Sequence, residues 1–259
     1  MHISKRLQTI VDMVKPGCYV CDVGCDHAYT SIALVENGKC PYAVASDVRP
    51  GPLAAAQKNI DDAGLTEKIS VCLADGVPAG VHELLPEGRR TLVITGMGGM
   101  LICRILGEAG ERAAAFDEMV LSPQSDIDLV RKKLFDMDFT IDDEEMLIDE
   151  GKYYTVIRAE KNSEPGIRRE RKACAAESSE PNGGDSHFTE KRAELLYGPV
   201  LLGKRHPVLR KYLEKQEGTF EAILENLRRA GRGEDDERYR EVNLKREVLR
   251  EAQRYYEGD

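Results

Sequence analysis

The most informative segment of the chain is Val20-Cys21-Asp22-Val23-Gly24-Cys25-Asp26-His27-Ala28. Its apolar, strand-forming start leads through an acid-x-glycine turn into a helical pattern. Glycine at position 24 lets the backbone approach a ligand closely at the carboxyl edge of a first strand. An ordinary tight turn would explain the same residues. A degenerate dinucleotide fingerprint would also explain them, although Asp26 stands where that fingerprint has a glycine.

Around this turn, residues 1–160 alternate between strand-like and helix-like stretches. A helical pattern runs from Ile3 to Val14, and the later patterns predict helices over 30–36, 53–63, 100–108 and 126–137. Strands are predicted over 19–23, 42–46, 69–73, 92–95 and 119–122, and a closing pair of strands over 139–160. Such alternation is typical of a parallel sheet with helices on both faces. We therefore predict an α/β fold with a doubly wound, Rossmann-like sheet of the methyltransferase type.

The remaining residues have a different composition. Residues 161–188 contain few large apolar side chains and include Glu180-Pro181-Asn182-Gly183-Gly184-Asp185, which predicts a flexible linker. Apolar residues then recur at helical spacing over 209–227 and 239–256, on either side of a turn at 230–236. Two charged helices joined by a short turn predict an antiparallel coiled-coil hairpin within a carboxyl-terminal domain over 189–259.

Composition restricts the class of protein. The chain has 259 residues, of which 41% are hydrophobic, and a mean hydropathy of −0.44. No apolar run approaches the roughly 20 residues that span a bilayer, and the amino terminus has no apolar signal core. The seven cysteines follow no disulfide framework. Cys18 and Cys21 should face opposite sides of a strand, so we expect no metal site. These features predict a cytoplasmic protein that does not bind a membrane.

The net charge of −9 is unevenly distributed. Residues 1–160 hold 16 Lys and Arg against 26 Asp and Glu, a net charge of −10, whereas residues 187–259 hold 16 against 15, a net charge of +1. A polyanion would therefore be bound by local patches, most plausibly in the last third of the chain. The absence of Trp and an aromatic content of 6% argue against a stacking-rich single-strand binder.

Acids at the predicted strand ends indicate the kind of ligand. Asp47 ends the second strand, where a carboxylate can accept two hydrogen bonds from ribose hydroxyls, and Asp75-Gly76 follows the third. Together with Asp22, these acids suit an adenosyl ligand without phosphates, such as S-adenosylmethionine, because they would repel a pyrophosphate. Helix capping or turn formation would also explain Asp47 and Asp75.

A second glycine-rich segment, Gly96-Met97-Gly98-Gly99, follows the fourth strand. Glycines are costly in conformational entropy, so this cluster needs a reason. In amino-methylating enzymes the corresponding loop holds the acceptor base near the methyl donor. Close packing of the backbone on a neighbouring helix is the alternative. Gln124, after the fifth strand, places an amide where a base edge could be read.

Several of these motifs together resemble the bacterial tRNA (adenine-22-N1)-methyltransferase family. They are Ser4-Lys5-Arg6-Leu7, Asp22-Val23-Gly24-Cys25-Asp26-His27-Ala28-Tyr29, Asp75-Gly76, Gly96-Met97-Gly98-Gly99, Gly151-Lys152-Tyr153-Tyr154 and Leu196-Tyr197-Gly198-Pro199. The resemblance implies a class I S-adenosylmethionine-dependent fold that methylates a D-arm adenine in tRNA. The chain departs from the family pattern at Cys25, Thr30, Ser31, Ser122 and Gln124, which affects acceptor details more than the cofactor.

The predicted site follows from the motifs and this resemblance. The residues expected to bind S-adenosylmethionine are Asp22, Gly24, Asp47, Val48, Asp75, Gly76, Gly96, Met97 and Gly98. Asp26 is the predicted catalytic carboxylate, either stabilising the cationic product or accepting a hydrogen bond from the exocyclic amine. His27 is predicted to orient Asp26 or to touch a phosphate, and a local cap or packing role is its alternative.

Two other functions are compatible with the sequence. One is S-adenosylmethionine-dependent methylation of a different acceptor, and the other is a non-catalytic binding module that uses the coiled coil. For the preferred function we expect tRNA as the partner, no DNA, and a monomer.

Overall fold

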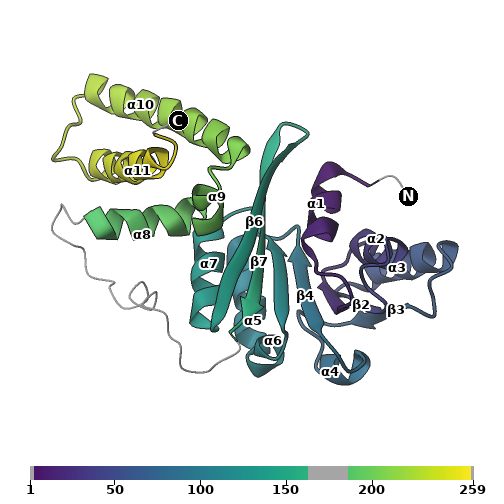
Figure 1. Cartoon of the computed structure of the whole chain (residues 1–259). Coiled ribbons are helices and arrows are strands. Elements are labelled where there is room, and N and C mark those ends of the chain that lie inside the picture. Colours follow the sequence, from purple (N-terminus) through teal and green to yellow (C-terminus); the bar gives the residue numbers. More distant parts are fainter. Residues whose placement is uncertain (1–2, 163–185, 258–259) are drawn as a thin grey trace. The chain divides into compact units, whose positions relative to one another are not determined.

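The computed structural model describes residues 3–162 and 186–257, and the chain divides into two compact units, Met1–Arg168 and Arg169–Asp259 (Figure 1). Most of the predicted linker over 161–188 lies outside the described residues. The predicted domain limits at 160 and 189 and the linker therefore stay predictions.

The described part of the first unit contains a seven-stranded sheet in the order β3-β2-β1-β4-β5-β7-β6. The strands are β1 (Tyr19–Val23), β2 (Ala43–Asp47), β3 (Ile69–Leu73), β4 (Arg90–Thr95), β5 (Glu118–Ser122), β6 (Phe139–Asp149) and β7 (Lys152–Lys161). The first five pair in parallel, whereas β7 runs antiparallel to both β5 and β6. The predicted doubly wound sheet with its closing strand pair is confirmed.

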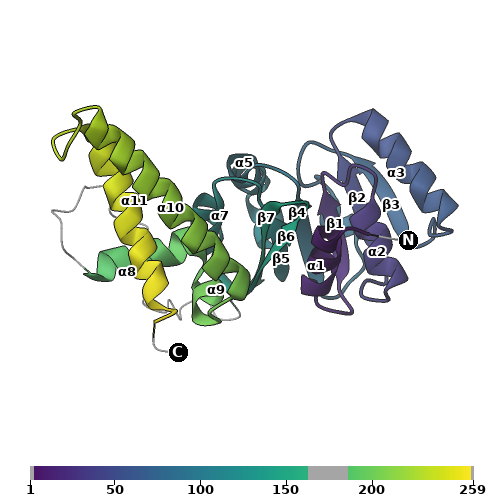
Figure 2. The ribbon, with the colours of Figure 1, turned by 90° about the horizontal axis from the view of Figure 1, so that it is seen from above.

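Helices cover both faces of this sheet (Figure 2). The helices in the described part of the first unit are α1 (Lys5–Met13), α2 (Tyr29–Glu36), α3 (Pro50–Asp62), α4 (Val81–Leu84), α5 (Gly99–Ala109), α6 (Glu111–Ala114) and α7 (Ile127–Asp136). Buried side chains of α1, α2 and α3 share one core cluster with β1 and β2. On the other face α5 packs against α7. The strand order reverses between β1 and β4, and the carboxyl ends beside such a switch point are where doubly wound sheets bind ligands.

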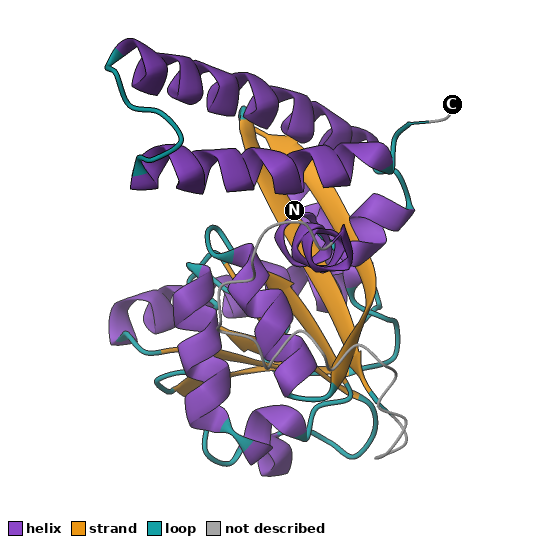
Figure 3. Cartoon of the chain, turned by 90° about the vertical axis from the view of Figure 1, so that its left-hand side faces the viewer, coloured by secondary structure: helices purple, strands orange, loops and turns teal. Residues whose placement is uncertain are grey.

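The second unit is helical in its described part. Its helices are α8 (Ser186–Tyr197), α9 (Pro199–Gly203), α10 (Pro207–Arg229) and α11 (Glu237–Arg254). The last two lie side by side and are joined by a short turn (Figure 3). Leu224, Tyr239 and Val242 are buried between them, and Arg228 donates a hydrogen bond to the Tyr239 hydroxyl over 2.8 Å. The predicted helical hairpin is confirmed, while its supercoiling stays a prediction.

None of the helices in the described ranges combines the length and the apolar character that crossing a membrane requires.

Candidate active site

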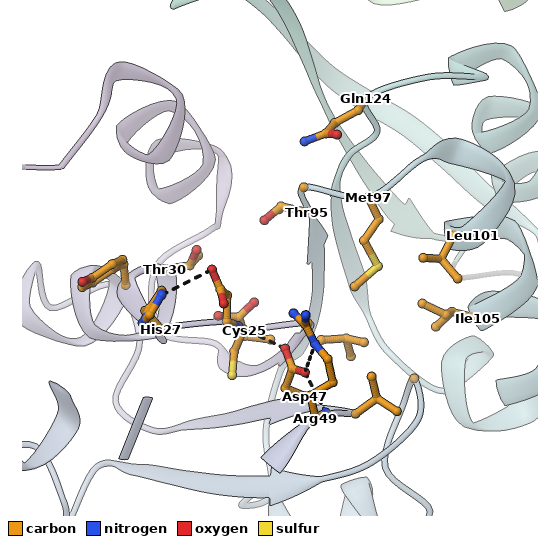
Figure 4. A pocket seen from close by; sticks show the side chains of 18 of the residues that line it. Cys25, His27, Thr30, Asp47, Arg49, Thr95, Met97, Leu101, Ile105 and Gln124 are labelled. Carbon is orange, nitrogen blue, oxygen red and sulfur yellow. Dashed lines mark hydrogen bonds and ion pairs between the residues drawn. The ribbon is translucent and has the colours of Figure 1, made fainter. Parts of the chain in front are cut away.

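A cavity of about 870 Å³ opens at the carboxyl ends of β1 to β4 in the first unit (Figure 4). Ligand pockets in proteins measure about 300–1,000 Å³, so this volume suits a nucleoside-sized molecule. Of the eleven predicted site residues, ten line it: Asp22, Gly24, Asp26, His27, Asp47, Val48, Asp75, Gly76, Gly96 and Met97. Residues more than 70 positions apart in the sequence therefore meet at one edge of the sheet.

The turn after β1 has an unusual backbone. Positive φ angles occur at Gly24 (73°), Asp26 (50°) and Ala28 (58°). The left-handed region is unfavourable for residues with a Cβ, and it concentrates at functional sites. Asp26 and Ala28 thus adopt a backbone conformation that favours glycine. The turn is fixed to β2, because the amides of Gly24 and Cys25 both donate to the Ser46 carbonyl, over 2.8 and 2.9 Å.

Asp22 lies at the base of the cavity and is only 2% exposed. The Ser31 hydroxyl, in the first turn of α2, donates to its Oδ2 over 2.8 Å. Burial raises the pKa of Asp22 to about 6, and the hydrogen bonds from Ser31 partly oppose that rise. The acid therefore connects the end of β1 to the start of α2 and sits where its charge is weakly solvated.

Asp47, the last residue of β2, is held in a fixed orientation. It is 5% exposed, and its Oδ1 accepts a hydrogen bond from the Arg49 amide over 2.9 Å. Its Oδ2 accepts one from the Asp26 amide over 3.4 Å, which couples this carboxylate to the turn after β1. A carboxylate oriented by two backbone donors still has lone pairs for ribose hydroxyls in the cavity.

Asp75 and Gly76 follow β3 on the same side of the sheet. Asp75 is exposed, and the φ of Gly76 is +77°. A Cβ at Gly76 would lie 3.2 Å from the Cγ2 of Ile105, which also lines the cavity. Glycine at this position therefore lets the loop after β3 approach the Ile105 side chain of α5 closely.

The glycine-rich loop after β4 is clamped to the loop after β5. The Gly99 amide donates to the Ser125 carbonyl and the Gln124 amide to the Met97 carbonyl, both over 2.9 Å. A Cβ at Gly99 would lie 2.4 Å from the carbonyl oxygens of Ser125 and Asp126. Close backbone packing therefore explains the glycine at position 99. The backbone that it packs against belongs to the loop before α7, and not to a helix as the alternative interpretation of this segment expected.

Gly98 does not line the cavity. It is the amino-terminal cap residue of α5, and a Cβ there would lie 3.2 Å from the Ser125 hydroxyl oxygen. Gly96, at a φ of +75°, and Met97 do line the cavity. A direct contact between Gly98 and the cofactor stays a prediction.

The two predicted catalytic residues project into the cavity opening. The side chains of Asp26 and His27 are 63% and 46% exposed, and the His27 Nε2 lies 3.8 Å from the Asp26 Oδ2. Met97 and Gln124 lie across the cavity from His27 (Figure 4). An acceptor entering between the two loops would meet Asp26 and His27 on one side and Gln124 on the other.

Other lining residues were not predicted as site residues. From α1 and the residues before it come Ile3, Ser4, Arg6 and Leu7; from α5 come Leu101, Arg104 and Ile105. The α5 set has i, i+3, i+4 spacing, so one helix face could have been assigned to the cavity. Arg6 is positioned by the closing strands: its amide donates to an Asp149 carboxylate oxygen over 3.2 Å, and its guanidinium lies 5.2 Å from the Tyr154 ring centre.

The chemistry of the lining fits a nucleoside without phosphates. Buried and exposed carboxylates dominate the ends of β1, β2 and β3, which disfavours a polyphosphate and favours hydroxyl and amine donors. Among the described residues, no group of three or more His, Cys, Asp or Glu could hold a metal ion.

Comparisons with known proteins agree with this fold. A family model described as a methyltransferase domain matches residues 3–157. The chain is 28% identical over 255 residues to the tRNA (adenine(22)-N(1))-methyltransferase of Bacillus subtilis (strain 168), and the match covers 97% of each protein.

Solved structures extend the likeness to the whole chain. Streptococcus pneumoniae Sp1610, a candidate tRNA (m1A22) methyltransferase, is 30% identical with a TM-score of 0.77, covering 97% of this chain and 99% of that one. Its complex with S-adenosyl-L-methionine is 29% identical with a TM-score of 0.72, over 97% and 99% of the two chains. The chain therefore belongs to the methyltransferase-domain family and, within it, to the bacterial tRNA (adenine-22-N1)-methyltransferase family.

Proposed function

We propose that this chain transfers a methyl group from S-adenosylmethionine to N1 of adenine 22 in the D-arm of tRNA. The observation that carries the proposal is the cavity at the ends of β1 to β4, in which three acids surround space for an adenosyl group. Whole-chain similarity to tRNA (adenine-22-N1)-methyltransferases supports the acceptor. Because tRNA is the partner, we place the reaction in the cytoplasm.

The reaction requires no covalent intermediate with the protein. S-adenosylmethionine supplies an activated methyl group on a sulfonium. Adenine N1 has an in-plane lone pair that would form a bond to that methyl as the sulfur–methyl bond breaks and neutral S-adenosylhomocysteine leaves. The chain therefore needs to align the reacting atoms and exclude water. Because N1 normally lies inside a base pair, the adenine must be unpaired or flipped out. Asp26, exposed at the cavity opening, stabilises the positive charge that develops on the adenine.

The cofactor contacts are assigned to the strand-end residues. Asp47 binds the ribose hydroxyls, Asp75 receives the adenine amino group, and Gly24 and Gly96 allow close backbone approach. Asp22, Val48, Gly76 and Met97 complete the lining.

Asp47→Ala tests this assignment. It should weaken S-adenosylmethionine binding by about 1.5–3 kcal/mol, the range for hydrogen bonds to charged groups. Isothermal titration calorimetry on the folded variant measures the loss. An unchanged dissociation constant would remove Asp47 from the site.

The acceptor is tested by mass spectrometry of tRNA from a strain that lacks the gene. We expect N1-methyladenosine at position 22 to disappear and to return when the wild-type gene is restored. Purified protein should also methylate that adenine in an unmodified transcript. Persistence of the modification would point to another acceptor, and S-adenosylmethionine binding without any transfer would point to a non-catalytic binding module.

A further inference from the structure

A pair of stacked, partly exposed rings lines the cavity, and neither ring is among the residues assigned above to the cofactor. The ring centres of His27 and Tyr29 are 5.5 Å apart, and their planes meet at 26°. Both residues line the cavity. Tyr29 is 43% exposed and is the one aromatic residue among the exposed large apolar side chains of the described part of the chain.

The backbone holds this pair in place. Tyr29 begins α2, and Ala28, between the two rings in sequence, has a left-handed φ of 58°. The Asn59 Nδ2 in α3 donates to the His27 carbonyl over 3.0 Å, and the Ala28 amide donates to the Cys25 carbonyl over 2.7 Å. The left-handed conformation at Ala28 therefore joins two rings that stack at the cavity, and the His27 side chain stays 46% exposed there.

Purine bases that leave a helix are commonly bound by stacking on aromatic side chains. We propose that the adenine presented for methylation stacks on the exposed face of His27, and that Tyr29 backs the imidazole ring from its other side. This inference rests on the proposed function and adds to it the surface that holds the acceptor base. The Asp26 carboxylate, 3.8 Å from the His27 Nε2, then lies beside the stacked base. His27 touches the substrate in this arrangement, and Tyr29 is a positioning residue.

The stack has a chemical consequence. Flipping a base out of its helix costs a few kcal/mol, and stacking on an aromatic ring offsets part of that cost. The methylated adenine is cationic, and aromatic faces attract cations, so a ring stack suits the product better than the neutral base. A single platform of this kind needs few aromatic residues, which is consistent with the low aromatic content of the chain.

Two substitutions at His27 separate stacking from hydrogen bonding. His27→Phe keeps a flat ring and removes both ring nitrogens, whereas His27→Gln keeps a polar group of similar length and removes the ring. We expect His27→Gln to lower kcat/KM for tRNA by about 5- to 150-fold, the equivalent of losing one base–aromatic stack. His27→Phe should recover most of that loss. Calorimetry should give S-adenosylmethionine affinities within about twofold of wild type for both variants, since neither removes a strand-end acid.

Tyr29→Leu, with Tyr42→Leu as its matched control, tests the backing ring. Tyr42 immediately precedes β2 at the opposite end of that strand from Asp47, so it lies away from the cavity. Tyr29→Leu should lower kcat/KM for tRNA by at least about fivefold, while Tyr42→Leu should not.

A spectroscopic measurement reports the stack directly. 2-Aminopurine placed at position 22 of the tRNA is quenched when it stacks. Its emission in the complex should be higher with His27→Gln than with wild type or His27→Phe. Equal 2-aminopurine emission in all three complexes would overturn the stack. A wild-type methylation rate for His27→Gln together with a lowered rate for His27→Phe would also overturn it. In that case a wild type that still methylates adenine 22 leaves the proposed function standing; a wild type that leaves adenine 22 unmethylated overturns both.

Discussion

At the scale of single residues, the buried carboxyl of Asp22 makes the stability of the fold depend on pH. Burial raises its pKa from 3.8 to about 6, so the folded protein holds the proton more tightly than the unfolded chain does. The stability that this protonated carboxyl contributes is fully present below pH 3.8 and is lost as the pH rises through about 6. Near neutral pH the carboxylate is ionised in a place that water hardly reaches, which destabilises the fold.

Asp22→Asn should therefore stabilise the protein near neutral pH. The amide keeps an acceptor for the Ser31 hydroxyl and removes the charge, so at pH 7.5 the free energy of unfolding should rise by up to about 3 kcal/mol. At pH 4 the gain should shrink below about 1 kcal/mol, because wild-type Asp22 is then protonated in the folded state. Urea denaturation at both pH values measures the difference. A gain of equal size at both would contradict the assigned pKa.

Asp26 differs from Asp22 in being exposed, and we expect it to act on the transfer step. Asp26→Asn keeps the side-chain shape and the positive φ, and asparagine tolerates that conformation. Cofactor affinity should stay near wild type, while the single-turnover rate with saturating tRNA should fall at least about tenfold through loss of charge stabilisation. Rapid-quench kinetics measure the single-turnover rate. A rate within twofold of wild type would reassign Asp26 to the turn.

At the scale of elements, the sequence predicted β1 and β3 with the observed limits and β2 one residue early. Strands such as β2 and β5, which are buried along their whole length, can be located in the sequence because they are short apolar runs. The four- and five-residue helices α4, α6 and α9 were not predicted, since a single helical turn has too few residues to show a period. The cavity residues after the strands were predictable from topology. The helix faces that complete the cavity were not assigned, because they depend on how α1 and α5 pack.

The role of Gly99 also depends on tertiary packing. Its neighbours Ser125 and Asp126 lie more than 25 positions away, so no local pattern reveals the 2.4 Å approach to their carbonyl oxygens. Gly99→Ala should force the two loops apart and lower the free energy of unfolding by about 1–3 kcal/mol, the usual cost of overpacking. Gly107→Ala, in the same helix with only a Lys133 side-chain end nearby, is the matched control and should be neutral or stabilising. Thermal denaturation of both variants compares them, and an unchanged Gly99→Ala would contradict this packing.

At the scale of the whole molecule, the two units carry different charges. The net charge of −10 over residues 1–160 repels an RNA backbone, whereas residues 187–259 are nearly neutral. Many cations of α10 and α11 pair with acids one turn away, as Arg210 does with Glu214 and Lys245 with Glu241. Exposed pairs of this kind contribute only about 0.3–0.5 kcal/mol each, so phosphates can displace the acids at small cost. The ion pairs therefore do not prevent these cations from contacting phosphates.

Shortening the chain to residues 1–168 tests this division of labour. The cut lies beyond β7, which ends at Lys161, and it coincides with the end of the first compact unit. The shortened protein should bind S-adenosylmethionine with nearly wild-type affinity, because the cavity belongs to the first unit. It should lose tRNA methylation through weakened RNA affinity, and the salt dependence of tRNA binding should become shallower as phosphate contacts disappear. Filter binding across a salt series measures both quantities, and circular dichroism checks that the unit stays folded. Equal affinity and equal salt slope for the two proteins would show that the hairpin does not bind the RNA and would favour a role in recruiting a protein partner.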